Sequence, residues 1–157
     1  SHLEGEEVVV WANGVDLGTD SNYEQTYTVA SGAITLPYAT SNVTVGLPYT
    51  ARFKSSKLML QTQTEVLFGK ERRITALSLV LADTHAKGIR FGPDYDNMDD
   101  RPETDGWTSV DPDNIDSDYD ADMIQFPSTW TTDLRLCLKA QAPRPCTVLA
   151  VKLVAEV

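Results

Sequence analysis

The stretch Ile74-Thr75-Ala76-Leu77-Ser78-Leu79-Val80-Leu81-Ala82 places a leucine at every second position from 77 to 81. Successive side chains of a β-strand point to opposite faces, so this spacing puts the three leucines on one face. A helix in a protein interior can contain the same residues, because the intervening positions are apolar or small. The turn-like sequences on both sides favour a strand, and we predict one over residues 74–82.

Short runs of the same kind recur along the chain and end at turn residues. Val8-Val9-Val10-Trp11 is followed by Asn13-Gly14, a dipeptide that favours a tight β-hairpin. Asn42-Val43-Thr44-Val45 alternates polar and apolar residues, which is typical of a half-buried strand. About ten such runs without an amphipathic helix predict an all-β fold. We expect a β-sandwich or a β-barrel-like domain with a long acidic loop.

The length of the chain fits one domain. We expect a single β domain over residues 3–157, with the acidic loop inserted at about 93–122, because the sequence shows no internal repeat and no interdomain linker. Ser1-His2 resembles the remnant of a cleaved expression tag. No apolar stretch approaches the roughly 20 residues that cross a bilayer, and the acidic start is unlike a signal peptide.

The formal net charge of −10 is concentrated in one segment. Between Asp94 and Asp122 there are twelve acidic residues and one basic residue, Arg101, a balance of −11. The rest of the chain has eleven acidic and twelve basic residues, a balance of +1. A surface of negative sign repels phosphate backbones, so the composition argues against tight, sequence-independent binding of nucleic acid.

Four aspartates of that segment stand at every second position: Asp116, Asp118, Asp120 and Asp122. Carboxylate oxygens bind Ca²⁺ when the backbone wraps around the ion, so these residues form a candidate divalent-cation site. The EF-hand pattern is not met, because its glycine and glutamate positions are Ala121 and Pro127 here. A solvated acidic loop and a docking surface for a basic partner are the alternatives.

The sequence offers little support for enzyme catalysis. His85 is the only histidine beyond the first two residues, and there is no Gly-x-Ser-x-Gly elbow, phosphate-binding glycine loop or zinc-type histidine pair. Two acidic residues could form a carboxylate pair for glycoside hydrolysis, but an Asp-rich loop does not provide the desolvation that raises a carboxyl pKa. We expect a non-enzymatic protein without catalytic residues, and no cofactor other than the candidate Ca²⁺.

The two cysteines, Cys137 and Cys146, are too few for a disulfide framework or a four-thiolate zinc site. They flank the turn-like residues 140–145, so a symmetric hairpin would place them opposite each other and allow a cross-strand disulfide. Two reduced, half-buried thiols are the other interpretation.

Basic side chains fall into two groups, Arg52, Lys54 and Lys57, and then Lys70, Arg72 and Arg73. Arg52 and Lys54 are expected on one face of a strand, and the second group is expected to line the next turn. These cations could pair with the acidic loop of a neighbouring subunit or touch DNA that passes through a channel. They could also simply keep an exposed sheet edge soluble.

Residues 32–53 carry a resemblance to a known family. Gly32–Leu36, Ala39 and Val43–Ala51 resemble a stretch of podovirus tail-tube proteins, the tail tubular protein B or tail nozzle family. The most diagnostic part is Val45-Gly46-Leu47-Pro48-Tyr49. Lys70–Ile74 and residues 130–157 are similar to the basic turn and the C-terminal strand of the family.

The resemblance implies a bacteriophage virion structural protein and one domain of a longer chain. It implies a ring around the DNA exit channel at the end of a short tail, with no catalytic residues to carry over. The implied partners are sister subunits and other tail proteins, with DNA only in passage and no membrane. The implied location is the virion tail, assembled in the host bacterial cytoplasm. Tyr49 would lie at a packing interface or would cover the domain's own core.

A carbohydrate- or receptor-binding β-sandwich module on a virion or cell surface is the alternative function. Three tryptophans and six tyrosines could supply a stacking platform for sugar rings. Trp107, within the acidic segment, is the candidate ligand contact, whereas Trp11 and Trp130 lie in strand contexts and are expected in the core.

Overall fold

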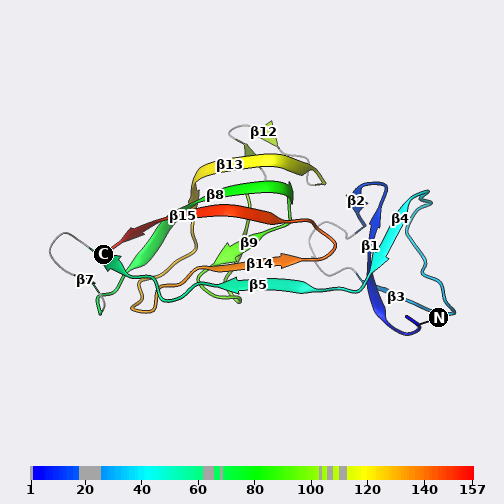
Figure 1. The fold of residues 1–157 in the computed structure, drawn as a ribbon, viewed down its shortest axis with the longest axis horizontal. Helices are drawn as coiled ribbons and strands as arrows, with labels where there is room; N and C mark the ends of the chain where they lie inside the picture. Colours follow the sequence, from blue (N-terminus) through cyan, green and yellow to red (C-terminus); the bar gives the residue numbers. More distant parts are fainter. Residues whose placement is uncertain are drawn as a thin grey trace.

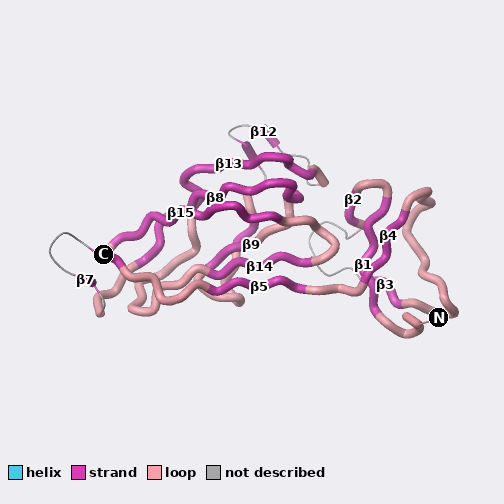
Figure 2. The backbone as a smooth tube through the Cα atoms, viewed as in Figure 1, coloured by secondary structure: helices cyan, strands magenta, loops and turns pink. Residues whose placement is uncertain are grey.

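The computed structural model describes residues 2–17, 26–61, 66, 67, 69–102, 104, 105, 108, 109 and 113–157, with the backbone alone at 60, 61, 66, 67, 104, 105, 108, 109, 121 and 122. Strands and loops make up all of this part of the chain (Figure 2). Because no described residue is helical, the described chain contains no helix that could cross a membrane. The predicted all-β fold class is confirmed.

Two antiparallel sheets form a sandwich-like body (Figure 1). The first sheet has the strand order β13–β8–β15, with β13 at Ile115–Gln125, β8 at Arg73–His85 and β15 at Thr147–Glu156. The second sheet has the order β10–β9–β14–β5, with β10 at Asp99–Asp100, β9 at Arg90–Gly92, β14 at Cys137–Gln141 and β5 at Thr50–Lys54. The outermost strands are therefore β13 and β15 in one sheet and β10 and β5 in the other.

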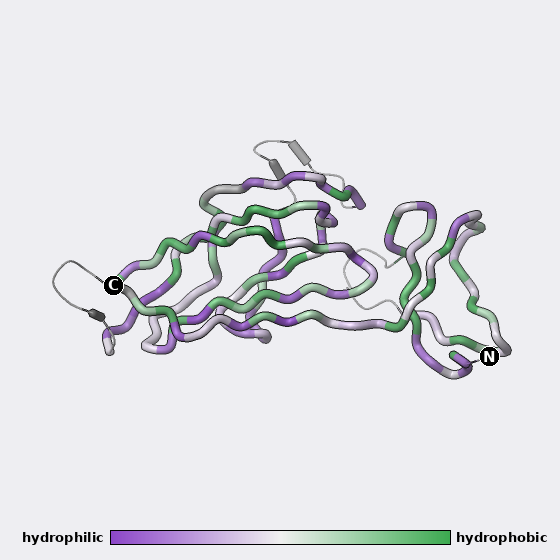
Figure 3. Tube along the Cα trace, viewed as in Figure 1, coloured by the Kyte–Doolittle hydropathy of each residue, from purple (hydrophilic) through white to green (hydrophobic). Residues whose placement is uncertain are grey.

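The main hydrophobic core lies between these sheets, and β8 supplies its centre. Leu77, Leu79 and Leu81 are fully buried and belong to the same apolar cluster as Phe91 and Leu138 of the second sheet. Hydrophobic residues follow one another along β8 and β15 in Figure 3. The strand predicted from the leucine spacing is confirmed, and each buried leucine stabilises the fold by roughly 2 kcal/mol.

Four strands between residues 7 and 46 form a separate sheet, at the end of the molecule where the N-terminus lies (Figure 1). They are β1 at Glu7–Ala12, β2 at Val15–Asp16, β3 at Tyr27–Thr28 and β4 at Val43–Gly46. β1 pairs with each of the other three. The turn between β1 and β2 has positive φ at Asn13 (52°) and Gly14 (89°), as the predicted hairpin requires.

Side-chain contacts between described residues join this N-terminal sheet to the body. Nε of Arg144 donates a hydrogen bond to Oδ2 of Asp16 at 2.7 Å, and these side chains are only 7% and 6% exposed. The ring of Trp11 meets the ring of His85 edge to face, with centroids 5.8 Å apart. β1 and β2 are thus fixed against the end of β8 and the connection that leads into β15.

The acidic segment is not one continuous loop, and that expectation is wrong for residues 115–122, which belong to β13. Aspartates alternate here with Ile115, Ser117 and Tyr119, which gives the strand one apolar face and one acidic face. The segment also contains β10 and a hairpin of β11 (Thr104–Asp105) and β12 (Thr108–Ser109). A similar short hairpin joins β6 (Leu60–Gln61) and β7 (Val66–Leu67).

The two cysteines do not face each other across a hairpin, so that interpretation is wrong. Cys137 begins β14 in the second sheet, whereas Cys146 precedes β15 in the first sheet, and the residues between them cross from one sheet to the other. Both cysteines are free. Burial raises the pKa of each thiol above its ordinary value.

Candidate interaction surface

β5 is an open edge of the second sheet. It pairs with β14 on one side, and no strand of the described chain lies along its other side. All five of its residues are exposed, although the strand belongs to the body. An unpaired edge offers backbone N–H and C=O groups to an incoming strand, and proteins usually cover or charge such edges.

The inner face of β5 borders an apolar groove. Phe53 lies opposite Leu138, which in turn lies opposite Phe91. The two partners are buried, but Phe53 is 53% exposed. A groove of about 570 Å³ between β5 and β15 is lined mainly by apolar side chains, among them Phe53, Leu58, Leu136, Val151 and Leu153. The sandwich is therefore open between these two edge strands.

The outer face of β5 begins a row of cations. Arg52, Lys139 and Arg90 lie directly opposite one another on β5, β14 and β9, and Asp100 on β10 ends the row. Nε of Arg90 pairs with Oδ1 of Asp100 at 2.9 Å. Lys54 lies two residues from Arg52 and so shares its face, as predicted. Because like charges opposite one another destabilise a sheet, an anionic partner on this face would relieve a repulsion.

β13 is one of the two edge strands of the first sheet, the other being β15, and the outer face of β13 has the opposite charge to that of β5. Tyr119 lies opposite Leu81 and packs against the core. Asp118 and Asp120 alternate with Tyr119, so they point away from the core, and both are exposed. The two open edges β5 and β13 thus carry two exposed cations and two exposed carboxylates, each pair spaced two residues apart.

The structure does not gather Asp116, Asp118 and Asp120 of the candidate cation site around one point. Side chains two residues apart on a strand are roughly 6.5 Å apart, too far to share one Ca²⁺ without a wrapped backbone. Asp116 forms a salt bridge with Arg101 and accepts a hydrogen bond from Asn114 at 2.6 Å. The side chain of Asp122 lies outside the described residues. No three described His, Cys, Asp or Glu residues are grouped to hold a metal ion.

Buried arginines are the feature that sequence reasoning missed. Arg101 is 3% exposed, and its guanidinium lies 4.1 Å from the ring centroid of Tyr119, so it ties the connection after β10 to β13. Arg72, expected to line a turn, is instead fully buried, and its Nη2 donates to the carbonyl of Thr132 at 3.3 Å. That expectation is wrong for Arg72, and composition alone contains no signal for either burial.

The exposure of the tryptophans differs from the prediction. Trp130 is 48% exposed, and the guanidinium of Arg73 lies 5.3 Å from its ring centroid, so its expected core position is wrong. Trp11 is half-buried at the contact with His85. Trp107, the candidate ligand contact, lies outside the described residues.

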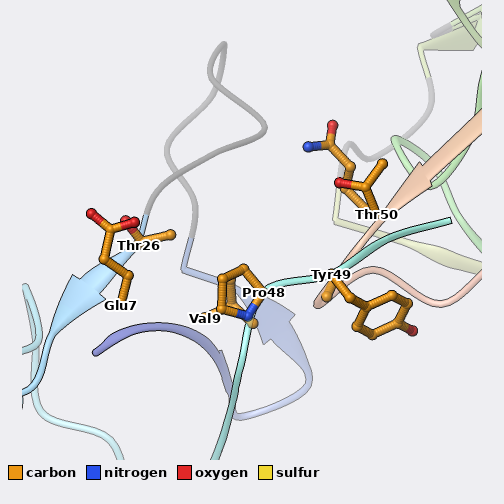
Figure 4. A pocket seen from close by; sticks show the side chains of 8 residues that line it. Glu7, Val9, Thr26, Pro48, Tyr49 and Thr50 are labelled. Carbon is orange, nitrogen blue, oxygen red and sulfur yellow. The ribbon is translucent and has the colours of Figure 1, made fainter. Parts of the chain in front are cut away.

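The residues of the family resemblance connect β4 to β5. Tyr49 is 67% exposed, so it does not cover the core. A pocket of about 460 Å³ lies beside this connection, with Glu7 and Thr26 on one side and Thr50 on the other (Figure 4). In Figure 4 the ring of Tyr49 points away from Glu7 and Thr26. Among the described residues that line this pocket, Glu7 is the only carboxylate, so they do not provide an acid–base pair.

His85, the candidate histidine for catalysis, is buried beside Trp11. Burial lowers its pKa, with the charge of Arg144 as the next cause. Its Nδ1 accepts a hydrogen bond from the backbone N–H of Lys87 at 3.1 Å. The hydroxyl of the adjacent Thr84 donates to the carbonyl of Ala82 at 2.9 Å, so it is not aimed at the imidazole. The arrangement fits a neutral structural histidine.

No family model matches the chain, and no curated protein matches it.

Proposed function

We propose that this chain is a non-enzymatic structural domain of a short-tailed bacteriophage virion, part of a tail tube or nozzle component. Its role is assembly of the tail around the DNA exit channel, through contacts with sister subunits and other tail proteins. The resemblance at residues 45–49 supports the assignment, and these residues lead directly into β5.

The observation that carries the proposal is the open side of the sandwich. β5 leaves a strand edge, the exposed Phe53 and an apolar groove on one side of the body. Soluble proteins seldom leave such an edge and groove uncovered unless another chain occupies them. A surface of this kind suits permanent assembly better than the binding of a small substrate.

Mass spectrometry of virions tests the proposal. Particles of the source phage are purified by density gradient, and their proteins are digested and identified. We expect peptides of this chain at a constant ratio to the major tail proteins, and loss of infectious, tailed particles when its gene is interrupted. Absence of the peptides from infectious virions would contradict the assignment.

A carbohydrate- or receptor-binding module is the second candidate, and the exposed Trp130 favours it. An accessible indole ring can stack on a sugar ring. Glycan-array binding that is lost in Trp130→Ala or Trp107→Ala, with unchanged circular dichroism, would support this function in place of assembly.

A further inference from the structure

We propose that β5 of one copy of this chain pairs edge to edge with β13 of a second copy, head to tail. This inference rests on the proposed assembly function and names the partner of the β5 edge. Both strands are edges in the described chain, since β5 pairs with β14 alone and β13 pairs with β8 alone.

The side-chain patterns of the two edges are complementary. On β5, Ala51 and Phe53 alternate with Arg52 and Lys54, so the apolar and the cationic side chains point to opposite faces of the strand. Arg52 also borders the groove, and its guanidinium lies 5.2 Å from the ring centroid of Tyr95. On β13, Tyr119 faces the core while Asp118 and Asp120 face outward. Pairing β13 with β5 therefore places carboxylates beside cations on the outer face and apolar side chains beside the groove.

The sheets of the two copies can also continue one another with their core-facing sides aligned. Edge pairing would join the second sheet of one copy to the first sheet of the next, and the inner face of each sheet already packs on its own core. Because β5 of one copy meets β13 of the other, each dimer keeps one free β5 and one free β13. Such a heterologous contact repeats, and it closes into a ring or extends into a tube according to its rotation.

Charge favours a second copy over DNA as the occupant of this surface. The chain has a net charge of −10, and its two exposed β13 carboxylates match the two exposed cations of β5 in number and spacing. A DNA backbone would meet repulsion from the rest of the surface. Arg52, Lys139 and Arg90 could still hold phosphates, so DNA binding is an outcome that the experiment must detect.

Sedimentation equilibrium of complementary variants tests the proposal. Arg52→Glu/Lys54→Glu disables the β5 edge, and Asp118→Lys/Asp120→Lys disables the β13 edge. Neither variant threatens the fold, because all four side chains are exposed. In low salt we expect the unchanged chain to form oligomers larger than a dimer. For each variant alone, the dissociation constant should rise by about tenfold.

The decisive result comes from mixing. In an equimolar mixture, the unchanged β5 of one variant can pair with the unchanged β13 of the other. The two substituted edges also carry opposite charges, so alternating oligomers larger than a dimer should form again. Combining all four substitutions in one chain exchanges the charges and should restore oligomers. Lys152→Glu and Glu71→Lys are the controls for altered charge outside both edges, and they should associate as the unchanged chain does.

Three results would overturn the inference. The unchanged chain could remain monomeric at about 1 mM in low salt. The variants could associate as well as the unchanged chain. Fluorescence anisotropy could show that duplex DNA binds the unchanged monomer but does not bind Arg52→Glu/Lys54→Glu. That result would mean that the cations of β5 bind DNA and not a second copy. If the chain is monomeric but its peptides occur in virions, the β5–β13 contact is refuted and the proposed function stands. If the chain forms these oligomers but is absent from virions, the proposed function is refuted and the contact stands.

Discussion

Asp16→Asn should lower the free energy of unfolding by about 3 kcal/mol. Asp16 and Arg144 lie 2.7 Å apart, and their side chains are 6% and 7% exposed, so water screens this pair little. Removing one partner of a buried pair costs about 3–5 kcal/mol, because the other charge stays buried without its counter-charge. Asparagine keeps the shape and one acceptor oxygen, which puts the expected loss at the lower end of that range.

The chain offers a matched exposed pair as the control. Nη2 of Arg73 and Oε2 of Glu156 are 2.9 Å apart, but their side chains are 42% and 51% exposed. An exposed pair contributes about 0–1 kcal/mol, so Glu156→Gln should have little effect. Urea unfolding followed by tryptophan fluorescence measures both variants, and hydrogen exchange of β1–β4 shows where the loss acts.

The same pair should respond differently when both charges are replaced. Replacing both charges, in Asp16→Asn/Arg144→Met, should recover most of the stability lost in Asp16→Asn, because no unpaired charge remains. Equal losses for Asp16→Asn and Glu156→Gln would refute the view that the pair acts as a buried joint. So would unchanged hydrogen exchange in the N-terminal sheet.

Three further predictions concern the body. Burial lowers the pKa of His85, so below pH 6.5 the unfolded chain binds a proton more readily than the folded chain does. The free energy of unfolding should therefore fall from pH 7.5 to pH 5. His85→Gln should reduce this pH dependence, measured by urea unfolding at each pH. Leu79→Ala, at a fully buried position, should cost about 3 kcal/mol in urea unfolding, whereas Leu149→Ala, at a 63% exposed position, should change stability by less than about 0.5 kcal/mol. Because burial raises the pKa of Cys137 and Cys146, both thiols should react with a disulfide reagent at pH 8 more slowly than free cysteine does, and urea should remove the difference.

Local sequence predicted those elements whose side chains alternate between faces or whose turn needs a special backbone. Leucines at every second position identified β8, and Asn13-Gly14 identified the hairpin of β1 and β2. The same rule applied to residues 115–122 would have identified β13. Its aspartates suggested a loop by composition, although their spacing of two is that of a strand with one acidic face.

Long-range features could not be predicted in this way. The separation of Cys137 from Cys146 depends on which sheet each strand joins, and a turn sequence does not contain that choice. The row of Arg52, Lys139 and Arg90 exists only because three strands from distant parts of the chain lie in register. Only the spacing of Arg52 and Lys54 within one strand was accessible from sequence, and that part of the prediction is confirmed.

Arg52 and Lys54 either keep the β5 edge soluble or pair with carboxylates of a second copy. Added salt should strengthen association in the first case and weaken it in the second. Charges that only keep an edge soluble act by repulsion between monomers, which already carry −10 each; added salt screens that repulsion and strengthens association. Charges that pair with Asp118 and Asp120 of a second copy act by attraction, so added salt weakens association even though it also screens the net repulsion. Raising NaCl from about 20 mM to 300 mM shortens the Debye length from roughly 20 Å to 6 Å. Oligomers that dissociate over this range require attraction between charges at the contact. Oligomers that grow over the same range would mean that the charges of β5 only protect its edge.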